Sequence, residues 1–348
     1  MSLNDLSERE RRVLEAVIRS YVETAEPAGS RALVHRFGLG VSPATIRNTM
    51  SDLEAKGYLF HPHTSAGRVP TDKAYRLYVD SLLARPVPST PERERLTEQL
   101  ASGGGSAIEV ILRRAAQTLS VLTQELGVAL GPRLDQAVLQ RLELVRVSSE
   151  RLLMALTLGG GAVRTIFVDV HGEIAPEALS EVSTVLNERL AGLTLREIRS
   201  SLGARLRDST HHPTSHELLN IFVEEGEQLF EAALPLDEEN VVLGQASVLA
   251  EHPEFASGES LRKLMELTET RHQLGELLRR RSTQPGLSIT IGNEHHDPRL
   301  DNFTIVTAEY HAGPLSGVIG VLGPTRMPYD KVISLVSYTS LLVSDLLE

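Results

Sequence analysis

Capping and turn residues divide the first part of the chain into short helices, and few folds accommodate that succession. Ser7 and Glu10 form an S-x-x-E capping box, and the apolar spacing that follows predicts a helix over residues 7–23. A second helix begins at about Ser30 and ends at a glycine turn. The third has Ser42 as its N-cap and a proline at its first helical position, where a missing N–H costs nothing.

The segment after the third helix has the pattern of a two-stranded ribbon. Apolar residues at 58–60 and the segment 68–70 flank a polar turn at 61–67. Thr71 then begins a further amphipathic helix. Helix, helix, turn, helix and ribbon in this order predict an N-terminal winged helix-turn-helix.

The rest of the chain mixes strands and helices. At 348 residues it exceeds the size of one core, so the sequence predicts a multidomain α+β protein. Strands are expected before and after a helical block, which indicates one α/β domain interrupted by an insertion. The expected units are a DNA-binding domain at 1–84, a proline-containing linker at 85–105, an α/β domain at 106–172 and 273–348, and an inserted domain at 173–272. Beyond the linker, helices are expected at about 106–126, across 176–234 and at 260–281, followed by a closing amphipathic helix. Strands are expected at 138–147, 152–158, 163–170, 241–243, 287–291, 303–310 and 317–322.

Charge is unevenly distributed along the chain. The formal net charge is −11, yet residues 28–76 contain seven Lys/Arg and three Asp/Glu, a local balance of +4. A basic module on an acidic body favours local contact with nucleic acid. The chain has no cysteine, no apolar run long enough to span a membrane and no secretory leader, so a cytoplasmic protein is expected.

The third helix carries the strongest candidate site. Its apolar stripe leaves a small, polar opposite face, and Arg and Asn are the side chains that pair bidentately with guanine and adenine. The alternative is an ordinary solvated face. The candidate base-reading residues are Ser42, Thr45, Arg47, Asn48 and Ser51.

Two further segments are candidate backbone contacts. The ribbon turn offers His63, Thr64, Ser65 and Arg68 to phosphate or the minor groove, although a solvated hairpin tip is the alternative. At the second helix, Ser30 and Arg31 are placed to bring an N-terminal N–H cluster to phosphate. Simple capping by Ser30 explains that position almost as well.

The remaining candidate motifs are better explained by structural roles than by catalysis or metal binding. The histidine groups are better explained as solvated loops than as metal ligands, because neither has the spacing of a metal site. They are His211, His212 and His216, and His295 and His296 with Asp297. No phosphate loop, nucleophile elbow or paired-carboxylate set is present, so no enzyme, cofactor or metal is expected.

Two strings resemble a known family. Residues 41–48 (VSPATIRN), continuing to 53–59 (LEAKGYL), and residues 61–73 (HPHTSAGRVPTDK) resemble the HrcA family of bacterial heat-inducible transcription repressors. Weaker similarity extends over nearly the whole chain. Ala74 departs from the glycine expected there, with little consequence for the resemblance.

The resemblance implies more than the residues do alone. It implies that the α/β domain is GAF-like, that the insertion is a dimerisation domain, and that a homodimer binds an inverted-repeat operator, the CIRCE element, in double-stranded DNA. It also implies that the GroEL chaperonin maintains the repressor and that heat stress withdraws it. The alternative hypothesis is a ligand-sensing or protein-docking regulator without specific DNA binding.

Overall fold

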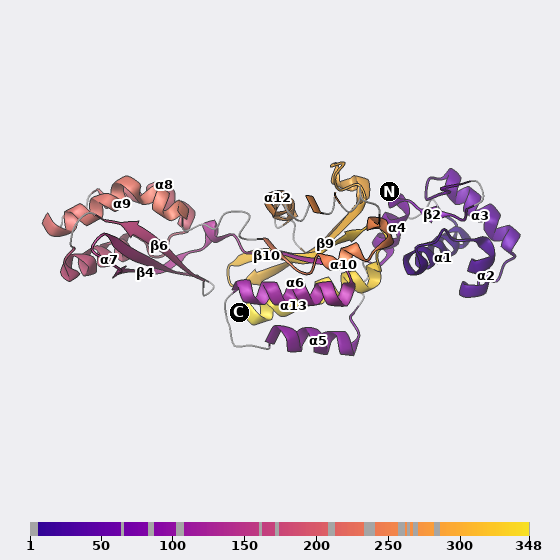
Figure 1. The fold of residues 1–348 in the computed structure, drawn as a ribbon, viewed down its shortest axis with the longest axis horizontal. Coiled ribbons are helices and arrows are strands. Elements are labelled where there is room, and N and C mark those ends of the chain that lie inside the picture. Colours follow the sequence, from indigo (N-terminus) through magenta and orange to yellow (C-terminus); the bar gives the residue numbers. More distant parts are fainter. Residues whose placement is uncertain are drawn as a thin grey trace.

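The chain folds into three parts that lie in a row (Figure 1). A helical N-terminal unit occupies one end, a five-stranded sheet with helices on both faces forms the centre, and a smaller unit with a three-stranded sheet lies at the other end. The computed structural model describes residues 6–63, 66–82, 87–101, 108–159, 162–170, 174–207, 213–232, 241–256, 262, 265–266, 271–281 and 286–347. In this part of the chain, no helix has the length and apolar character needed to cross a membrane.

The N-terminal unit has the predicted order of helices and strands. Its elements are α1 (Glu8–Thr24), α2 (Ser30–Phe37), α3 (Pro43–Ala55), β1 (Leu59–Phe60), β2 (Val69–Pro70) and α4 (Asp72–Leu82). The Ser7–Glu10 capping box is formed, and the Ser42 side chain caps α3 by accepting the Thr45 N–H. Because these caps satisfy helix-end N–H groups locally, the sequence located the starts of α1 and α3 to within a residue.

The ribbon is paired as predicted and is fixed to the start of α2. β1 and β2 are antiparallel, with Phe60 opposite Val69. Ala28 forms an isolated bridge with Arg68. A Cβ atom on Gly67 would lie 2.4 Å from the Pro27 carbonyl oxygen, so glycine is needed here for close backbone approach.

The expected linker at 85–105 contains a helix. Residues 90–101 form α5 (Thr90–Ala101), and Leu96 and Leu100 are buried against the central unit. The prolines did not prevent this helix, because Pro91 lies in its first turn, where no intrahelical N–H bond is lost. The interpretation of this segment as a linker was therefore wrong.

The central sheet is antiparallel throughout and has the order β7-β3-β10-β9-β8. Its strands are β3 (Leu126–Leu130), β7 (Val241–Leu243), β8 (Leu287–Ile291), β9 (Phe303–Ala312) and β10 (Leu315–Pro324). The helix expected to run to residue 126 ends at Thr123, and β3 follows after a two-residue connection. Buried Gly127 allows that close return of the chain against α6.

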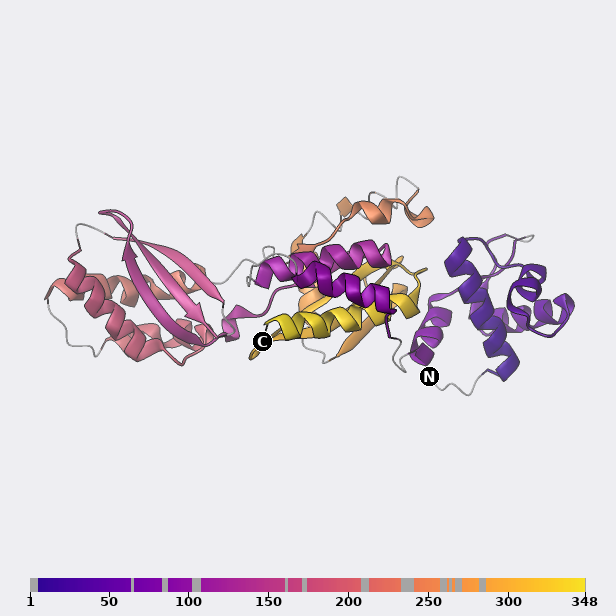
Figure 2. The same cartoon turned by 90° about the horizontal axis from the view of Figure 1, so that it is seen from below.

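Two helical layers cover the central sheet. One face packs against α6 (Ile108–Thr123) and α13 (Tyr329–Leu347), with α5 outside them, as Figure 2 shows from below. The other face packs against α10 (Ser247–Ala250), η3 (Pro253–Phe255) and α12 (Arg271–Arg281). Of the helix expected over 260–281, most positions before Arg271 lie outside the described residues.

The third unit has its own sheet and core. Its strands β4 (Leu139–Arg146), β5 (Arg151–Leu158) and β6 (Val163–Asp169) pair in chain order, after the short η2 (Leu134–Gln136). One sheet face packs against α7 (Pro176–Leu190), α8 (Leu195–Leu206) and α9 (Pro213–Ala232).

The expected domain boundaries do not match this topology. The chain leaves the central sheet after β3 and returns to it at β7, so an interruption is present. Strands β4 to β6, assigned from sequence to the α/β domain at 106–172, instead belong to the inserted unit, and β7 precedes the expected return at 273. Alternating burial marks a strand but does not identify its neighbours in a sheet, and this is why the boundary was misplaced.

Candidate nucleic-acid interface

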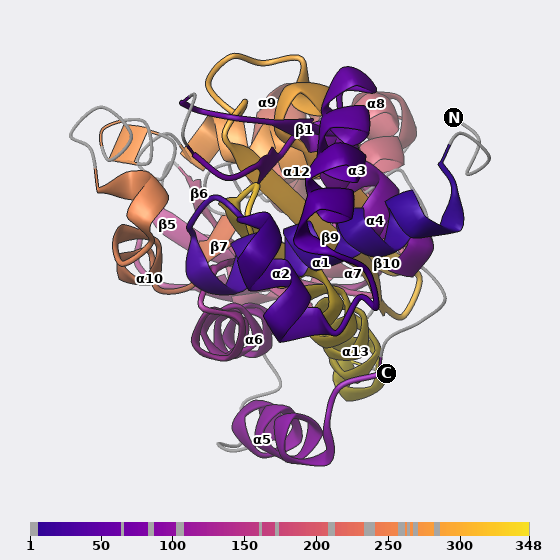
Figure 3. The same ribbon diagram turned by 90° about the vertical axis from the view of Figure 1, so that its right-hand side faces the viewer.

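Helix α3 has a buried face and an open face. Ile46, Met50 and Leu53 are buried against the rest of the N-terminal unit, as the apolar spacing predicted. Helix α3 lies at the free end of the molecule, where Figure 3 shows α2 and α3 toward the viewer. Of the predicted base-reading residues, Ser42, Arg47, Asn48 and Ser51 are exposed and Thr45 is half-buried.

Some polar side chains on this open face already have hydrogen-bond partners within the protein, and others do not. The Ser42 and Thr45 hydroxyls are 2.9 Å apart and bond each other, and Ser51 donates to the Arg47 carbonyl oxygen at 3.1 Å. Among the residues that the structure describes, the Arg47 and Asn48 side chains have no such partner. These two side chains are therefore the ones most available to pair with base edges.

The predicted wing residues do not form one exposed cluster. His63 is exposed, and Thr64 and Ser65 lie outside the described residues. Arg68 is not at a tip: its Nη2 atom lies 2.8 Å from Glu54 Oε2, and its side chain is only 20% exposed. Arg68 consequently fixes the base of the ribbon to α3, and it would have to leave Glu54 to bind phosphate.

Glu54 is a functional candidate that sequence reasoning missed. Its carboxylate pairs with Arg68, which directly precedes β2, and with His61 Nδ1, which directly follows β1. One carboxylate therefore holds both strands of the ribbon against α3. Nothing in the local sequence signals this, because the partners lie 7 and 14 residues away across a turn.

The start of α2 differs from the prediction. Gly29, not Ser30, is the N-cap residue, and no side chain caps this end. Ser30 is buried and 8% exposed, so its hydroxyl is not available to solvent. Arg31 is exposed next to the uncapped N–H groups, which keeps it as a candidate phosphate contact.

A partly buried ion pair joins the C-terminal end of α3 to α1. Lys56 Nζ, just after α3, lies 2.7 Å from Glu10 Oε1 on α1. The hydrogen bond from Lys56, with those from the Ser7 backbone and side chain, lowers the pKa of Glu10 to about 2 despite some desolvation. The capping box thus also fixes the C-terminal end of α3 to α1.

The two histidine groups singled out in the sequence form no metal site among the residues that the structure describes. In the described part of the chain, no group of three or more His, Asp or Glu side chains could hold a metal ion. His211 and His212 lie outside the described residues and His216 falls in α9, while His295 Nε2 lies 3.2 Å from the Phe303 carbonyl oxygen.

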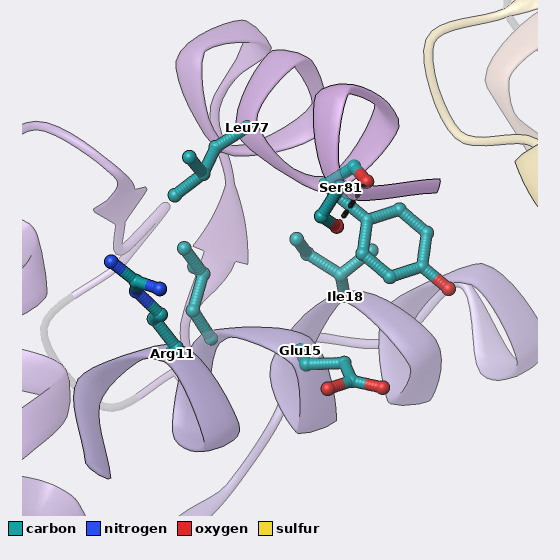
Figure 4. A pocket seen from close by; sticks show the side chains of 7 residues that line it. Arg11, Glu15, Ile18, Leu77 and Ser81 are labelled. Carbon is teal, nitrogen blue, oxygen red and sulfur yellow. Dashed lines mark hydrogen bonds between the residues drawn. The ribbon is translucent and has the colours of Figure 1, made fainter. Parts of the chain in front are cut away.

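A shallow pocket lies between α1 and α4 (Figure 4). Its volume is about 150 Å³, and its lining is mostly hydrocarbon from Leu14, Ile18, Leu77 and Tyr78, with Arg11 and Glu15 at its polar edge. The Ser81 hydroxyl donates to the Tyr78 carbonyl oxygen and so is already bonded within α4. The pocket does not include the open face of α3.

These features define a class: a small helical unit presents one polar helix face at the end of a larger α/β body. The chain belongs to the HrcA family, because residues 109–333 match the family model described as the HrcA protein C terminal domain. A heat-inducible transcription repressor HrcA of Geobacter sulfurreducens is 41% identical over 99% of each chain. Proteins of the same name from Chlorobium phaeobacteroides (40% identical, 97% of each chain) and Chlorobaculum tepidum (37% identical, 100% of this chain and 99% of the relative) are also similar.

A solved structure supports the fold. The crystal structure of a protein described as hypothetical superposes with a TM-score of 0.66 and covers 99% of each chain at 22% identity. At that identity the likeness concerns the arrangement of helices and strands alone.

Proposed function

We propose that this chain is a transcriptional repressor of heat-shock genes whose N-terminal unit is a winged helix-turn-helix. The observation that carries the proposal is the open face of α3, on which Arg47 and Asn48 are exposed and unbonded among the described residues. Membership of the HrcA family, whose relatives are named heat-inducible transcription repressors, supports heat-shock genes as the regulated class. Such a protein works where the chromosome is, in the cytoplasm.

We further propose that α3 enters the major groove and the flanking elements bind the backbone. A helix in the groove brings exposed side chains at its N-terminal half to the base edges. In this arrangement Arg31 and the uncapped N–H groups of α2 contact phosphate, and His63, Thr64 and Ser65 contact the backbone from the ribbon turn. Arg68 mainly holds the ribbon through Glu54.

The repressor is proposed to act as a homodimer on the inverted-repeat CIRCE operator. The inserted unit supports this, since its helices pack on one face of the sheet and the other face carries exposed apolar side chains among charged and polar ones. Val145, Leu153 and Phe167 lie opposite one another across the three strands, and Val145 and Phe167 are 50% and 57% exposed. A second copy is the occupant that an inverted repeat requires, because its symmetry mirrors a two-fold protein axis.

Regulation is proposed to pass through the chaperonin. By resemblance to its family, GroEL maintains the active repressor, and heat stress diverts GroEL to unfolded clients so that repression lapses. The central domain is proposed to be GAF-like, without an assigned ligand.

The proposal is tested by fluorescence anisotropy of the purified chain with a labelled CIRCE-type repeat and a scrambled duplex, over several salt concentrations, with and without GroEL. Selective, salt-sensitive binding supports operator recognition. Equal or absent binding to both duplexes by folded protein would favour the docking-regulator alternative.

Replacing Arg47 by alanine should weaken operator binding. If Arg47 reads a guanine, the expected loss is about 1 to 3 kcal/mol, confined to one base position, because only that base then loses its bidentate partner. Titration against operators with single base changes measures this. Arg113→Ala, which removes an exposed arginine from α6, is the control and should leave affinity unchanged. An equal loss on every sequence would show that Arg47 contacts phosphate.

Replacing Phe167 by aspartate should dissociate the dimer. In the proposed interface, aspartate at this position replaces a large aromatic contact with a charge and is expected to weaken association by about 2 kcal/mol or more. Sedimentation equilibrium measures the change. Phe60→Asp, an equal substitution at a 45% exposed phenylalanine of the N-terminal unit, should remain dimeric. Unaltered association of the Phe167 variant would place the dimer contact elsewhere.

A further inference from the structure

The N-terminal unit is packed directly onto the central unit. Helix α4 ends the N-terminal unit and packs against β8, and one continuous apolar core includes residues from both units. Tyr75 of α4 and Tyr329 of α13 are both buried, with ring centroids 5.6 Å apart. The angle between the two units is therefore set by side-chain contacts and not by a flexible connection.

Polar contacts also join α4 to η4 (Gly292–His295), the turn that follows β8. Arg76 of α4 donates through Nε to Glu294 at 2.7 Å and through Nη2 both to Glu294 and to the Ile289 carbonyl oxygen at 2.9 Å. Glu294 also accepts the Ile291 N–H at 2.9 Å. A guanidinium that engages a carboxylate and a carbonyl together fixes orientation, which a single point charge does not.

A second contact lies one helical turn away on α4. Asp72 Oδ2 accepts from the Asn293 backbone N–H at 3.0 Å and from its side-chain Nδ2 at 2.9 Å. Gly292 has a positive φ of +49°, and a Cβ atom there would lie 2.2 Å from the Asp72 carboxylate. The turn is therefore shaped to receive this carboxylate.

Glu294 is held in its ionised form, which favours these contacts at neutral pH. Burial alone would raise the pKa of Glu294, but the hydrogen bonds from Arg76 and the Ile291 N–H hold it below its usual range. A third contact lies at α1, where Arg326 Nη1 donates to the Val22 carbonyl oxygen at 2.6 Å while its guanidinium pairs with Glu254.

We propose that Asp72, Arg76, Asn293 and Glu294 are positioning residues that fix the angle of the DNA-binding unit on the body and thereby select the spacing of the two operator half-sites. This inference rests on the proposed function. We call these four residues the clamp. Its contacts leave the α3 face open, since Arg47 and Asn48 are exposed. The clamp thus holds the reading helix in place without covering it.

The physical consequence is specific to the dimer on a full repeat. A rigid angle lets the second half-site bind as an intramolecular event at one spacing and penalises the others. A loosened angle lowers that advantage at the selected spacing and reduces the penalty elsewhere. Each half-site still meets an unchanged α3.

The experiment compares the full chain with the double variant Arg76→Ala/Asn293→Ala, which removes side-chain contacts at both points. Anisotropy is measured on a CIRCE-type repeat, on repeats whose spacer is changed by up to about five base pairs, half a helical turn, and on a single half-site. We expect about tenfold weaker binding at the original spacing, a flatter spacing profile and half-site affinity within about twofold of wild type. Ser81→Ala, on the same helix, and Arg76→Lys, which keeps the charge, are the matched comparisons.

The outcomes separate the two proposals. An unchanged spacing profile in a folded double variant would overturn the clamp, as would tighter binding at the original spacing, since the clamp would then hold an unsuitable angle. A wild-type chain that does not distinguish the repeat from scrambled DNA would instead overturn the proposed function. The Arg76→Lys variant should retain part of the spacing selectivity, because a lysine keeps the ion pair but not the forked contact.

Discussion

Replacing Gly127 by alanine should destabilise the central domain by about 3 kcal/mol or more, at the upper end of overpacking costs. A Cβ atom on Gly127 would lie 1.9 Å from the Ala116 carbonyl oxygen and 2.7 Å from its carbonyl carbon, both in the backbone of α6. No rotation of a side chain relieves that overlap. Helix α6 would have to move off β3, which would disturb the hydrogen bond from the Gly127 N–H to Ser120 Oγ at 2.8 Å.

Chemical denaturation followed by circular dichroism measures this loss. Gly203→Ala is the matched control, because its Cβ would meet only the Val223 carbonyl oxygen at an ordinary 3.6 Å and Gly203 lies inside α8. The control should be stabilised by about 0.5 to 1 kcal/mol through the better helix propensity of alanine. Equal effects of the two substitutions would show that α6 and β3 are not in close contact.

Replacing Glu125 by glutamine should make the protein more stable at alkaline pH and leave its stability near pH 4 almost unchanged. Glu125 is fully buried, and neither carboxyl oxygen has a hydrogen-bond partner among the described residues. Burial raises the pKa of Glu125 well above its usual range, an effect that Arg326 opposes and Glu254 supports. Burial therefore favours the neutral acid form of this carboxyl in the folded protein.

The direction of the pH dependence follows from that raised pKa. Below the ordinary pKa of a glutamate, both folded and unfolded chains are protonated and nothing is lost. As the pH rises, the unfolded chain releases the proton and the folded chain keeps it, so the free energy of unfolding falls by about 1.4 kcal/mol per pH unit until the folded-state pKa is reached. The glutamine variant lacks this loss.

Urea unfolding of both proteins between pH 4 and pH 9 tests the prediction. The competing explanation is that Glu125 is ionised and paired with His252, whose Nε2 atom lies 3.7 Å from Glu125 Oε2. If the variant is less stable than wild type at alkaline pH, Glu125 is ionised and paired, and the neutral-acid assignment fails.

The N-terminal unit was predictable because its signals are local. Ser7, Glu10, Ser42 and Pro43 act within one helical turn, so the capping and apolar spacing located the helices and their buried face without tertiary information. The exposed Arg47 and Asn48 followed from the same spacing.

The missed features depend on contacts between distant residues. Helix α5 was taken for a linker because its prolines precede an amphipathic stretch whose partners, α6 and α13, are elsewhere in the chain. Strand β3 was absorbed into α6 because the apolar run is continuous from helix to strand. The partner of Arg68 and the sheet membership of β4 to β6 are likewise properties of the folded chain.

Hydroxyl-radical footprinting of the chain on a CIRCE-type repeat tests the central claim most directly. A dimer that reads an inverted repeat should protect two segments related by the operator dyad, one for each α3, and Arg47→Ala should shift both protections together to higher protein concentration. Arg113→Ala should leave the pattern intact. Absence of protection by folded protein, or uniform protection that scrambled DNA shows equally, would contradict sequence-specific operator binding.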